Sequence, residues 1–137
     1  MAGAGRLTQQ PPTPDPLLPT PLVLLTAELL GIPEPQLRDL PALRAALVAA
    51  AAAVGMGSLA MPTIHAGPHA QALILVSDAR HIIVHALPAE GALLLDVLAP
   101  AVQDSQRALD VFTRRLTPRH VRSDTRARLP EPESHSG

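Results

Sequence analysis

The placement of proline limits what this chain can fold into. Six of its 16 prolines fall within residues 1–21, and proline fixes φ and removes a backbone donor, which excludes helix and central strand from that segment. Residues 130–137 (Pro-Glu-Pro-Glu-Ser-His-Ser-Gly) are polar and also interrupted by proline. We therefore expect a disordered proline-rich arm over residues 1–21, one folded domain over residues 22–129 and a disordered tail over residues 130–137.

Short apolar runs separated by turn residues predict the elements of this domain. Apolar residues recur at helical spacing from the N-cap Asp39 to Gly55, and a second helix is expected from Ser105 to Leu116, before Pro118. The order β-α-β-β-β-β-α-β predicts an α+β two-layer sandwich, with two helices on one face of an antiparallel sheet. The expected strands cover residues 22–30, 58–64, 71–76, 81–87, 92–98 and 120–129.

Composition excludes several classes of protein. The formal net charge of −1 gives no electrostatic reason to expect a nucleic-acid or anionic-membrane partner. The chain has no cysteine, which rules out a disulfide, a thiolate zinc site and a thiol nucleophile. Residues 22–30 contain Glu28 and follow prolines rather than a basic segment, and the apolar run 45–57 is too short to span about 30 Å of hydrocarbon. We expect a cytoplasmic protein.

Histidines are the most polar feature of the middle of the chain. Strand alternation sends His81, Ile83 and His85 to one face of the run 81–87. Two histidines four residues apart on a strand are separated by about 13 Å, too far to share one metal ion.

Two other features of this region leave alternatives open. His65 and His69 flank a turn but have no third ligand, so no metal site is expected from them. Asp96 interrupts an apolar run, either as a functional acid or as a structural side chain bonded to the backbone or to a histidine.

These residues form a pattern that resembles a known family. The segment His81-Ile-Ile-Val-His85-Ala-Leu-Pro88-Ala-Glu-Gly91, followed by Leu95-Asp96-Val97, is similar to the signature of the small prokaryotic S-adenosylmethionine decarboxylases. That family reads Ser-His-Leu-Ser-Ile-His-Thr-Trp-Pro-Glu-Tyr-Gly, then an apolar strand into Asp-Val-Phe-Thr-Cys. The order of elements is also similar, over roughly residues 22–129.

The departures from the family pattern carry the functional expectation. The resemblance implies a serine that attacks the preceding carbonyl and leaves a pyruvoyl cofactor at the new N-terminus, but Ile83 occupies the matching position, and the nearest upstream hydroxyl is Ser77. Pro100 stands where the family has its proton-donor cysteine. We therefore expect a degenerate member that does not cleave itself and carries no pyruvoyl cofactor.

The resemblance also implies a ligand cleft. Ile64 and Leu87 match the aromatic positions that hold adenine, and Ala89 matches the glutamate, with Glu90 adjacent. His85 matches the histidine used in self-processing and is the retained catalytic candidate. The expected cleft residues are Ile64, His65, His81, Ile83, Leu87 and Asp96, while Gly91 is retained beside them.

By this resemblance the chain is linked to the biosynthesis of the polyamine spermidine. We expect an inactive partner or regulator, or a binder of a small molecule similar to S-adenosylmethionine. The resemblance further implies a homodimer, or a heterodimer with an active paralogue, that associates through the sheets. Two alternatives stay open: an active decarboxylase of S-adenosylmethionine or a related amino acid by a non-standard route, and a structural or interaction protein without a ligand.

Overall fold

The computed structural model describes residues 21–57 and 61–129. The tail over residues 130–137, and the arm up to residue 20, lie outside the described residues. The elements are β1 (Leu22–Leu30), α2 (Glu34–Arg38), α3 (Leu40–Ala53), β2 (Thr63–Ala66), β3 (Gln71–Ser77), β4 (Arg80–Leu87), the short 3-10 helix η1 (Pro88–Glu90), β5 (Ala92–Ala99), α4 (Val102–Leu116) and β6 (His120–Arg128).

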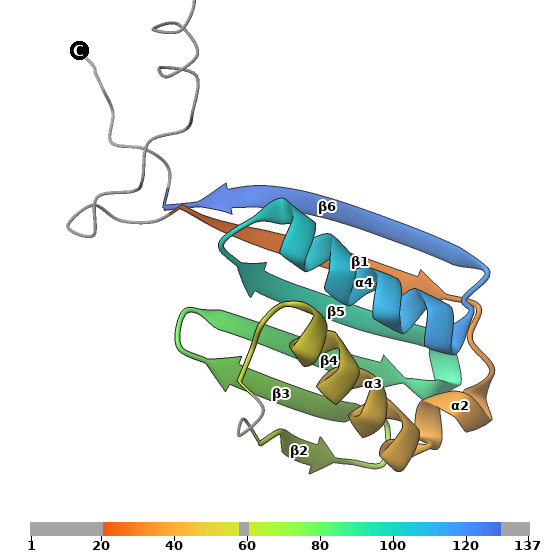
Figure 1. Ribbon diagram of the computed structural model, residues 1–137. Helices are drawn as coiled ribbons and strands as arrows, with labels where there is room; N and C mark the ends of the chain where they lie inside the picture. Colours follow the sequence, from red (N-terminus) through yellow and green to blue (C-terminus); the bar gives the residue numbers. More distant parts are fainter. Residues whose placement is uncertain (1–20, 58–60, 130–137) are drawn as a thin grey trace, which may run out of the picture.

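The strands form one sheet in the order β2-β3-β4-β5-β1-β6. Every pair of neighbours is antiparallel. Strands β2 to β5 follow one another by hairpins, whereas β1 inserts between β5 and β6, so the two ends of the domain pair with each other. Helices α3 and α4 lie side by side across one face of this sheet (Figure 1). The predicted two-layer α+β sandwich is thereby confirmed.

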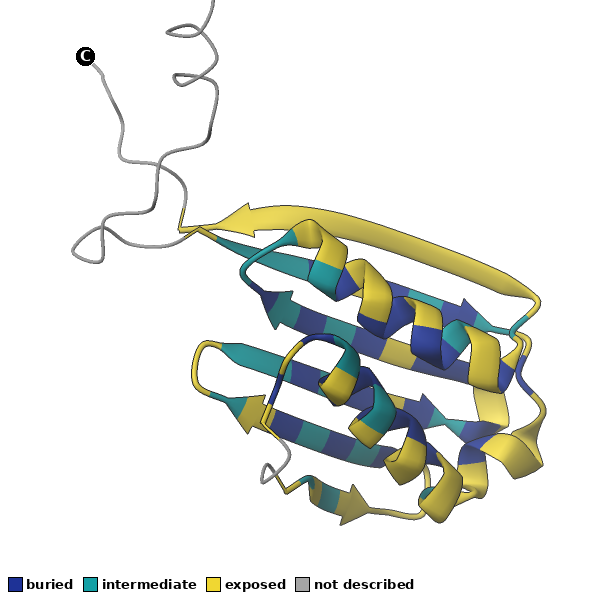
Figure 2. Ribbon diagram, viewed as in Figure 1, coloured by how far each residue is buried: buried dark blue, intermediate teal, exposed yellow. Residues whose placement is uncertain are grey.

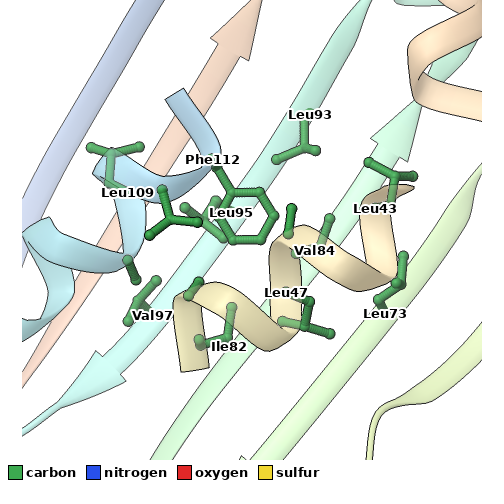
Figure 3. Close-up of a cluster of buried hydrophobic side chains, with 14 of the residues drawn as sticks. Leu43, Leu47, Leu73, Ile82, Val84, Leu93, Leu95, Val97, Leu109 and Phe112 are labelled. Atoms are coloured by element: carbon green, nitrogen blue, oxygen red, sulfur yellow. The ribbon is translucent and has the colours of Figure 1, made fainter. Parts of the chain in front are cut away.

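The hydrophobic core fills the space between the helices and the sheet. Strand alternation points every second residue of β3, β4, β5 and β1 toward α3 and α4, and these residues are the buried ones (Figure 2). Phe112 of α4 is fully buried, with Leu95 and Leu109 close to its ring (Figure 3). It is the only phenylalanine of a chain without tyrosine or tryptophan, so leucine, isoleucine, valine, alanine and Met56 supply the rest of the core.

The limits of α3 follow from its capping residues, as the sequence predicted. The Asp39 side chain accepts a hydrogen bond from the backbone N–H of Ala42 at 3.1 Å, and Pro41 lies in the first turn, where its missing N–H has no cost. Gly55, with φ of 78°, follows the end of the helix in the left-handed conformation. Local capping residues therefore define this helix at both ends.

Three elements differ from the sequence-based expectation. Strand β2 covers Thr63–Ala66, so it begins after Pro62 and continues past the expected end at Ile64, while residues 58–60 of the expected strand lie outside the described residues. The Gly67–Ala70 turn, closed by a hydrogen bond of 2.9 Å from Gly67 N to Ala70 O, fixes which residues face β3. Helix α4 begins at Val102 rather than Ser105. Its N-cap residue is Ala101, which has no side chain that can accept a capping hydrogen bond, so the sequence gives no signal for this start.

The short helix α2 was not expected. It begins after Pro33, and its Leu37 is fully buried. The side chain of Gln71, itself buried in β3, donates a hydrogen bond of 3.1 Å to the carbonyl of Leu37. This bond between distant segments ties α2 to the sheet, which local patterns do not predict. No helix within residues 21–57 and 61–129 is long and apolar enough to cross a membrane.

Candidate functional site

The face of the sheet opposite the helices, here termed the open face, carries the candidate residues. None of the helices in the described part of the chain packs on it (Figure 1). Side chains alternate along a strand and residues in register share a face, so the pairing defines its members. They are Leu22, Leu24, Thr26, Glu28 and Leu30 of β1; Thr63 and His65 of β2; Ala72, Ile74 and Val76 of β3; His81, Ile83, His85 and Leu87 of β4; Ala92, Leu94, Asp96 and Leu98 of β5; and His120, Arg122, Asp124, Arg126 and Arg128 of β6.

The carboxylate and arginine side chains of the open face gather over β5, β1 and β6. The register aligns Ile83, Asp96, Thr26 and Asp124 in one row across four strands. In the next row the carboxylate of Glu28 accepts a hydrogen bond from the guanidinium of Arg122 on β6 and forms an ion pair with it. Glu28 and Arg122 are 94 positions apart in the sequence, so the sheet topology alone brings them together.

A hollow of about 460 Å³ lies over these strands. Its lining includes carboxylates, a guanidinium, hydroxyl residues and apolar residues. They are the acidic Glu28, Asp96 and Asp124, the basic Arg122, the hydroxyl residues Thr26 and Ser123, and the apolar Ala27 and Leu94. The hollow thus presents charged, hydroxyl and apolar groups on one surface.

The fold changes the titration of His81. Burial lowers its pKa below the ordinary value of 6.5, and the nearby negative charge of Asp96 opposes that shift. Burial has the larger effect, because desolvation disfavours the charged imidazolium. The neutral imidazole is therefore the favoured form of His81 at neutral pH.

This shift predicts a pH dependence of stability. At pH values between the lowered pKa and 6.5, the unfolded chain binds a proton that the native chain does not bind, so stability falls as the pH decreases through this window. We expect the urea concentration at the midpoint of unfolding to fall less for His81→Gln than for the unchanged protein when the pH is lowered from 7.5 to 5.5. His69→Gln, in the exposed β2–β3 turn, is the matched control for the loss of one histidine. Equal dependence in the two variants would contradict the assignment.

Most of the residues singled out from the sequence lie on the open face. His65, His81, Ile83, Leu87 and Asp96 all have this orientation, as does His85, which is exposed. Pro100 follows the end of β5 directly.

Ile64 is different and corrects the expected lining of the cleft. It pairs with Leu73, a fully buried residue, and packs against the core on the helix side. The strand period of two residues explains this, because neighbouring His65 then points to the open face. Ile64 therefore does not line the surface that carries the other candidates.

The sequence did not identify Thr26, Arg122 or Asp124 as site residues. All three line the hollow. Arg122 and Asp124 belong to β6, which is exposed along its whole length and has no apolar alternation that would indicate which of its side chains lie on the open face. Only its pairing with β1 assigns these side chains to the open face.

The arrangement of the acidic and histidine side chains also bears on metal binding. No group of three or more histidine, aspartate or glutamate side chains within the described ranges is arranged to hold a metal ion. His65 and His85 share one row, but Ala72 separates them.

A tight turn connects β3 to β4 just before His81. Ser77 pairs with Arg80 across a two-residue turn, in which Asp78 adopts a φ of 54°. The Nε atom of Arg80 is buried without a hydrogen-bond partner. The pairing of β3 with β4 therefore extends up to this turn, and Arg80 is part of the ladder.

Together the fold and this surface define a class: an α+β sandwich of two layers with a polar site on its uncovered sheet. The family model for S-adenosylmethionine decarboxylase matches residues 23–129. The chain belongs to the S-adenosylmethionine decarboxylase family.

A solved structure agrees with this assignment at the level of the fold. The adenosylmethionine decarboxylase from Aquifex aeolicus VF5 is similar with a TM-score of 0.69 and 21% sequence identity, over 87% of this chain and 100% of that chain. A search of curated proteins gave no match.

Proposed function

We propose that this chain is a family member that neither processes itself nor decarboxylates S-adenosylmethionine. It acts instead as a non-catalytic partner or regulator of an active decarboxylase, or as a binder of a related small metabolite, in spermidine biosynthesis. As a partner it forms a homodimer, or a heterodimer with an active paralogue. The observation that carries this proposal is the side chain of Ile83, a hydrocarbon at the centre of β4.

The chemistry of the side chains supports this proposal. Formation of a pyruvoyl group requires a β-hydroxyl or β-thiol on the residue after the cleaved bond. Both serines of the family signature have counterparts here without one, since the first matches Arg80 and the second Ile83. The residues present therefore do not fit a pyruvoyl group, and we derive no catalytic step through it.

The neighbourhood of Ile83 offers no substitute nucleophile. In its row the hydroxyls are those of Thr63 on β2 and Thr26 on β1. Each lies two strands from Ile83, about 10 Å at the usual strand spacing. That is far beyond bonding distance from the backbone carbonyl of Ile82, which is held inside the β4 ladder. Pro100 has no side-chain proton to donate in place of the family cysteine.

The test is the intact mass and the activity of the purified protein. We expect one species of 14.4 kDa, with no fragments that part before Arg80 or Ile83, and no release of carbon dioxide from S-adenosylmethionine above the buffer rate. A serine-bearing enzyme of the family, handled in parallel, is the control. Cleavage, or carbon dioxide release by the isolated chain, would overturn the proposal in favour of a non-standard decarboxylase.

Ligand binding separates the two non-catalytic roles. A metabolite that binds only the native state raises the midpoint of thermal unfolding by mass action. We expect such a rise with S-adenosylmethionine or spermidine if the hollow on the open face is a binding site. Asp124→Asn, which removes one of its carboxylates, should reduce the rise. No shift with either compound favours a partner or structural role.

A further inference from the structure

We propose that the outer edge of β6 binds an extended, acidic segment of a partner protein, which adds to the sheet as a further strand. This inference goes beyond the proposed function and does not depend on it. It rests on the open backbone edge of β6, on the concentration of arginine beside that edge, and on the alternation of charge along the strand.

The backbone of β6 offers a long edge for an added strand. The strand order places β6 at one end of the sheet, and among the described residues it pairs only with β1 (Figure 1). Every second residue of such a strand turns its N–H and C=O away from its neighbour. β6 has nine exposed residues without a proline, whereas β2 at the opposite edge has only four residues. Long, uncovered edges of this kind bind extended peptides through main-chain hydrogen bonds.

Arginine is concentrated beside this edge. The segment from the last turn of α4 to the end of β6 holds six of the chain's 11 basic residues and only one of its 12 acidic residues, Asp124. Within the described ranges Arg122 is the only one of the six in an ion pair, which it forms with Glu28. The six exposed arginines, here termed the basic edge, are Arg114, Arg115, Arg119, Arg122, Arg126 and Arg128.

The two features together select the class of partner. A nucleic acid or an anionic membrane can contact the guanidinium groups, but it leaves the outward N–H and C=O groups of β6 without strand partners. An acidic polypeptide satisfies both, because arginine binds carboxylates through two parallel hydrogen bonds. A second β6 of this chain is disfavoured, since like charges directly opposite each other destabilise a strand pair. The basic edge therefore repels a copy of itself and attracts an acidic strand.

The pattern along β6 also specifies the spacing of the acidic residues. The even-numbered residues of β6 lie on the open face and the odd-numbered residues on the other face. Residues directly opposite each other on paired strands share a face, with Cβ atoms about 4.5–5.5 Å apart. Carboxylates at every second position of the partner therefore lie opposite Arg126 and Arg128, whereas the position opposite Asp124 requires an uncharged side chain.

The probe is the synthetic peptide acetyl-Glu-Thr-Glu-Thr-Gln-Thr-Glu-amide. In antiparallel pairing its glutamates lie opposite Arg128, Arg126 and Arg122, and its glutamine lies opposite Asp124. Hydrogen exchange of the full chain, followed by NMR at low salt, measures the contact. We expect the outward N–H groups of β6 to exchange rapidly in the free protein and to become protected when the peptide is added. No protection at a peptide concentration of about 1 mM would overturn the inference.

Substitution of two arginines tests the contribution of charge. We expect Arg126→Gln combined with Arg128→Gln to weaken peptide binding roughly fivefold, because two exposed ion pairs are lost. Arg44→Gln, at an exposed position of α3, is the matched control and should bind as the unchanged protein does. Arg126→Glu combined with Arg128→Glu should instead bind a peptide in which arginine replaces each glutamate. Equal weakening by the control, or failure of this exchange of charge, would contradict the assignment to β6.

Two N-methylated forms of the peptide test the backbone contact. Methylation of its odd-numbered residues removes one set of alternate N–H donors, and methylation of its even-numbered residues removes the other set. Only one set faces β6 in a strand pair, so we expect one form to lose binding and the other to keep it. Equal behaviour of the two forms would show that the peptide is held by charge alone and would overturn the added strand.

Other anionic partners give different results. Single-stranded oligothymidylate and vesicles of phosphatidylglycerol are added under the same conditions as the peptide. Tighter binding of either one, lost in the Arg126→Gln and Arg128→Gln variant without protection of the outward N–H groups, would overturn the inference in favour of a nucleic acid or a membrane. An uncleaved, inactive chain that binds no peptide overturns this inference alone. A chain that binds the peptide but is cleaved or active overturns only the proposed function.

Discussion

Replacement of Phe112 by alanine is expected to lower the free energy of unfolding by about 3–5 kcal/mol. Phe112 is fully buried between α4 and the sheet, and it is the only aromatic side chain of the core (Figure 3). Its neighbours come from rigid strands on one side and from a helix on the other, so they cannot close the cavity that the ring would leave. A domain of this size has a total stability of about 5–15 kcal/mol. Urea denaturation followed by circular dichroism measures the loss.

The matched control is Val48→Ala on the outer side of α3. Val48 is 49% exposed, so its truncation should change the free energy of unfolding by no more than about 0.5 kcal/mol. A loss below about 1 kcal/mol for Phe112→Ala would show that the core is loosely packed around the ring, contrary to the structure.

The second large effect is expected for Gly91→Val, with a loss of about 3 kcal/mol. Gly91 ends η1 with φ of 63°, a left-handed conformation that a β-branched residue adopts only with strain. A Cβ at this position would also lie 3.1 Å from the carbonyl oxygen of Ile32. That backbone segment cannot move freely, because the N–H of Ile32 donates a hydrogen bond of 3.0 Å to the carbonyl of Gly91. Thermal and urea unfolding both measure the loss.

Gly55→Val separates the two causes. Gly55 has a similar φ of 78°, but a Cβ there would meet nothing within 4 Å. This variant should therefore show only the conformational strain, about 1–2 kcal/mol. Equal losses at both positions would mean that the close approach of Ile32 contributes nothing.

Elements with local signals could be predicted from the sequence. Helix α3 lies between Asp39, which caps it, and Gly55, which follows it in the left-handed conformation. The β2–β3 and β4–β5 hairpins follow from short apolar runs with brief links. Each of these signals involves residues within about four positions of one another, and such interactions form in the same way whatever the rest of the chain does.

Elements that depend on distant partners could not be predicted. Helix α2 has five residues and is held by Gln71 of β3, 34 positions further along the chain. Strand β2 is displaced because the turn after it and its pairing with β3 fix its register. Ile64 was assigned to the cleft for the same reason: a shift by one residue sends a side chain to the opposite face of a strand.

The sequence by itself determined the order of the six strands and the two long helices, the common face of His81, Ile83 and His85, and the absence of a β-hydroxyl at Ile83. These are properties of covalent chemistry and of strand period, which need no knowledge of distant contacts. Only the tertiary structure decided that β1 lies between β5 and β6, and so that Glu28 meets Arg122. The physical reason is that backbone hydrogen bonds between strands are the same for every residue type, so the choice of neighbour depends on how the whole core packs.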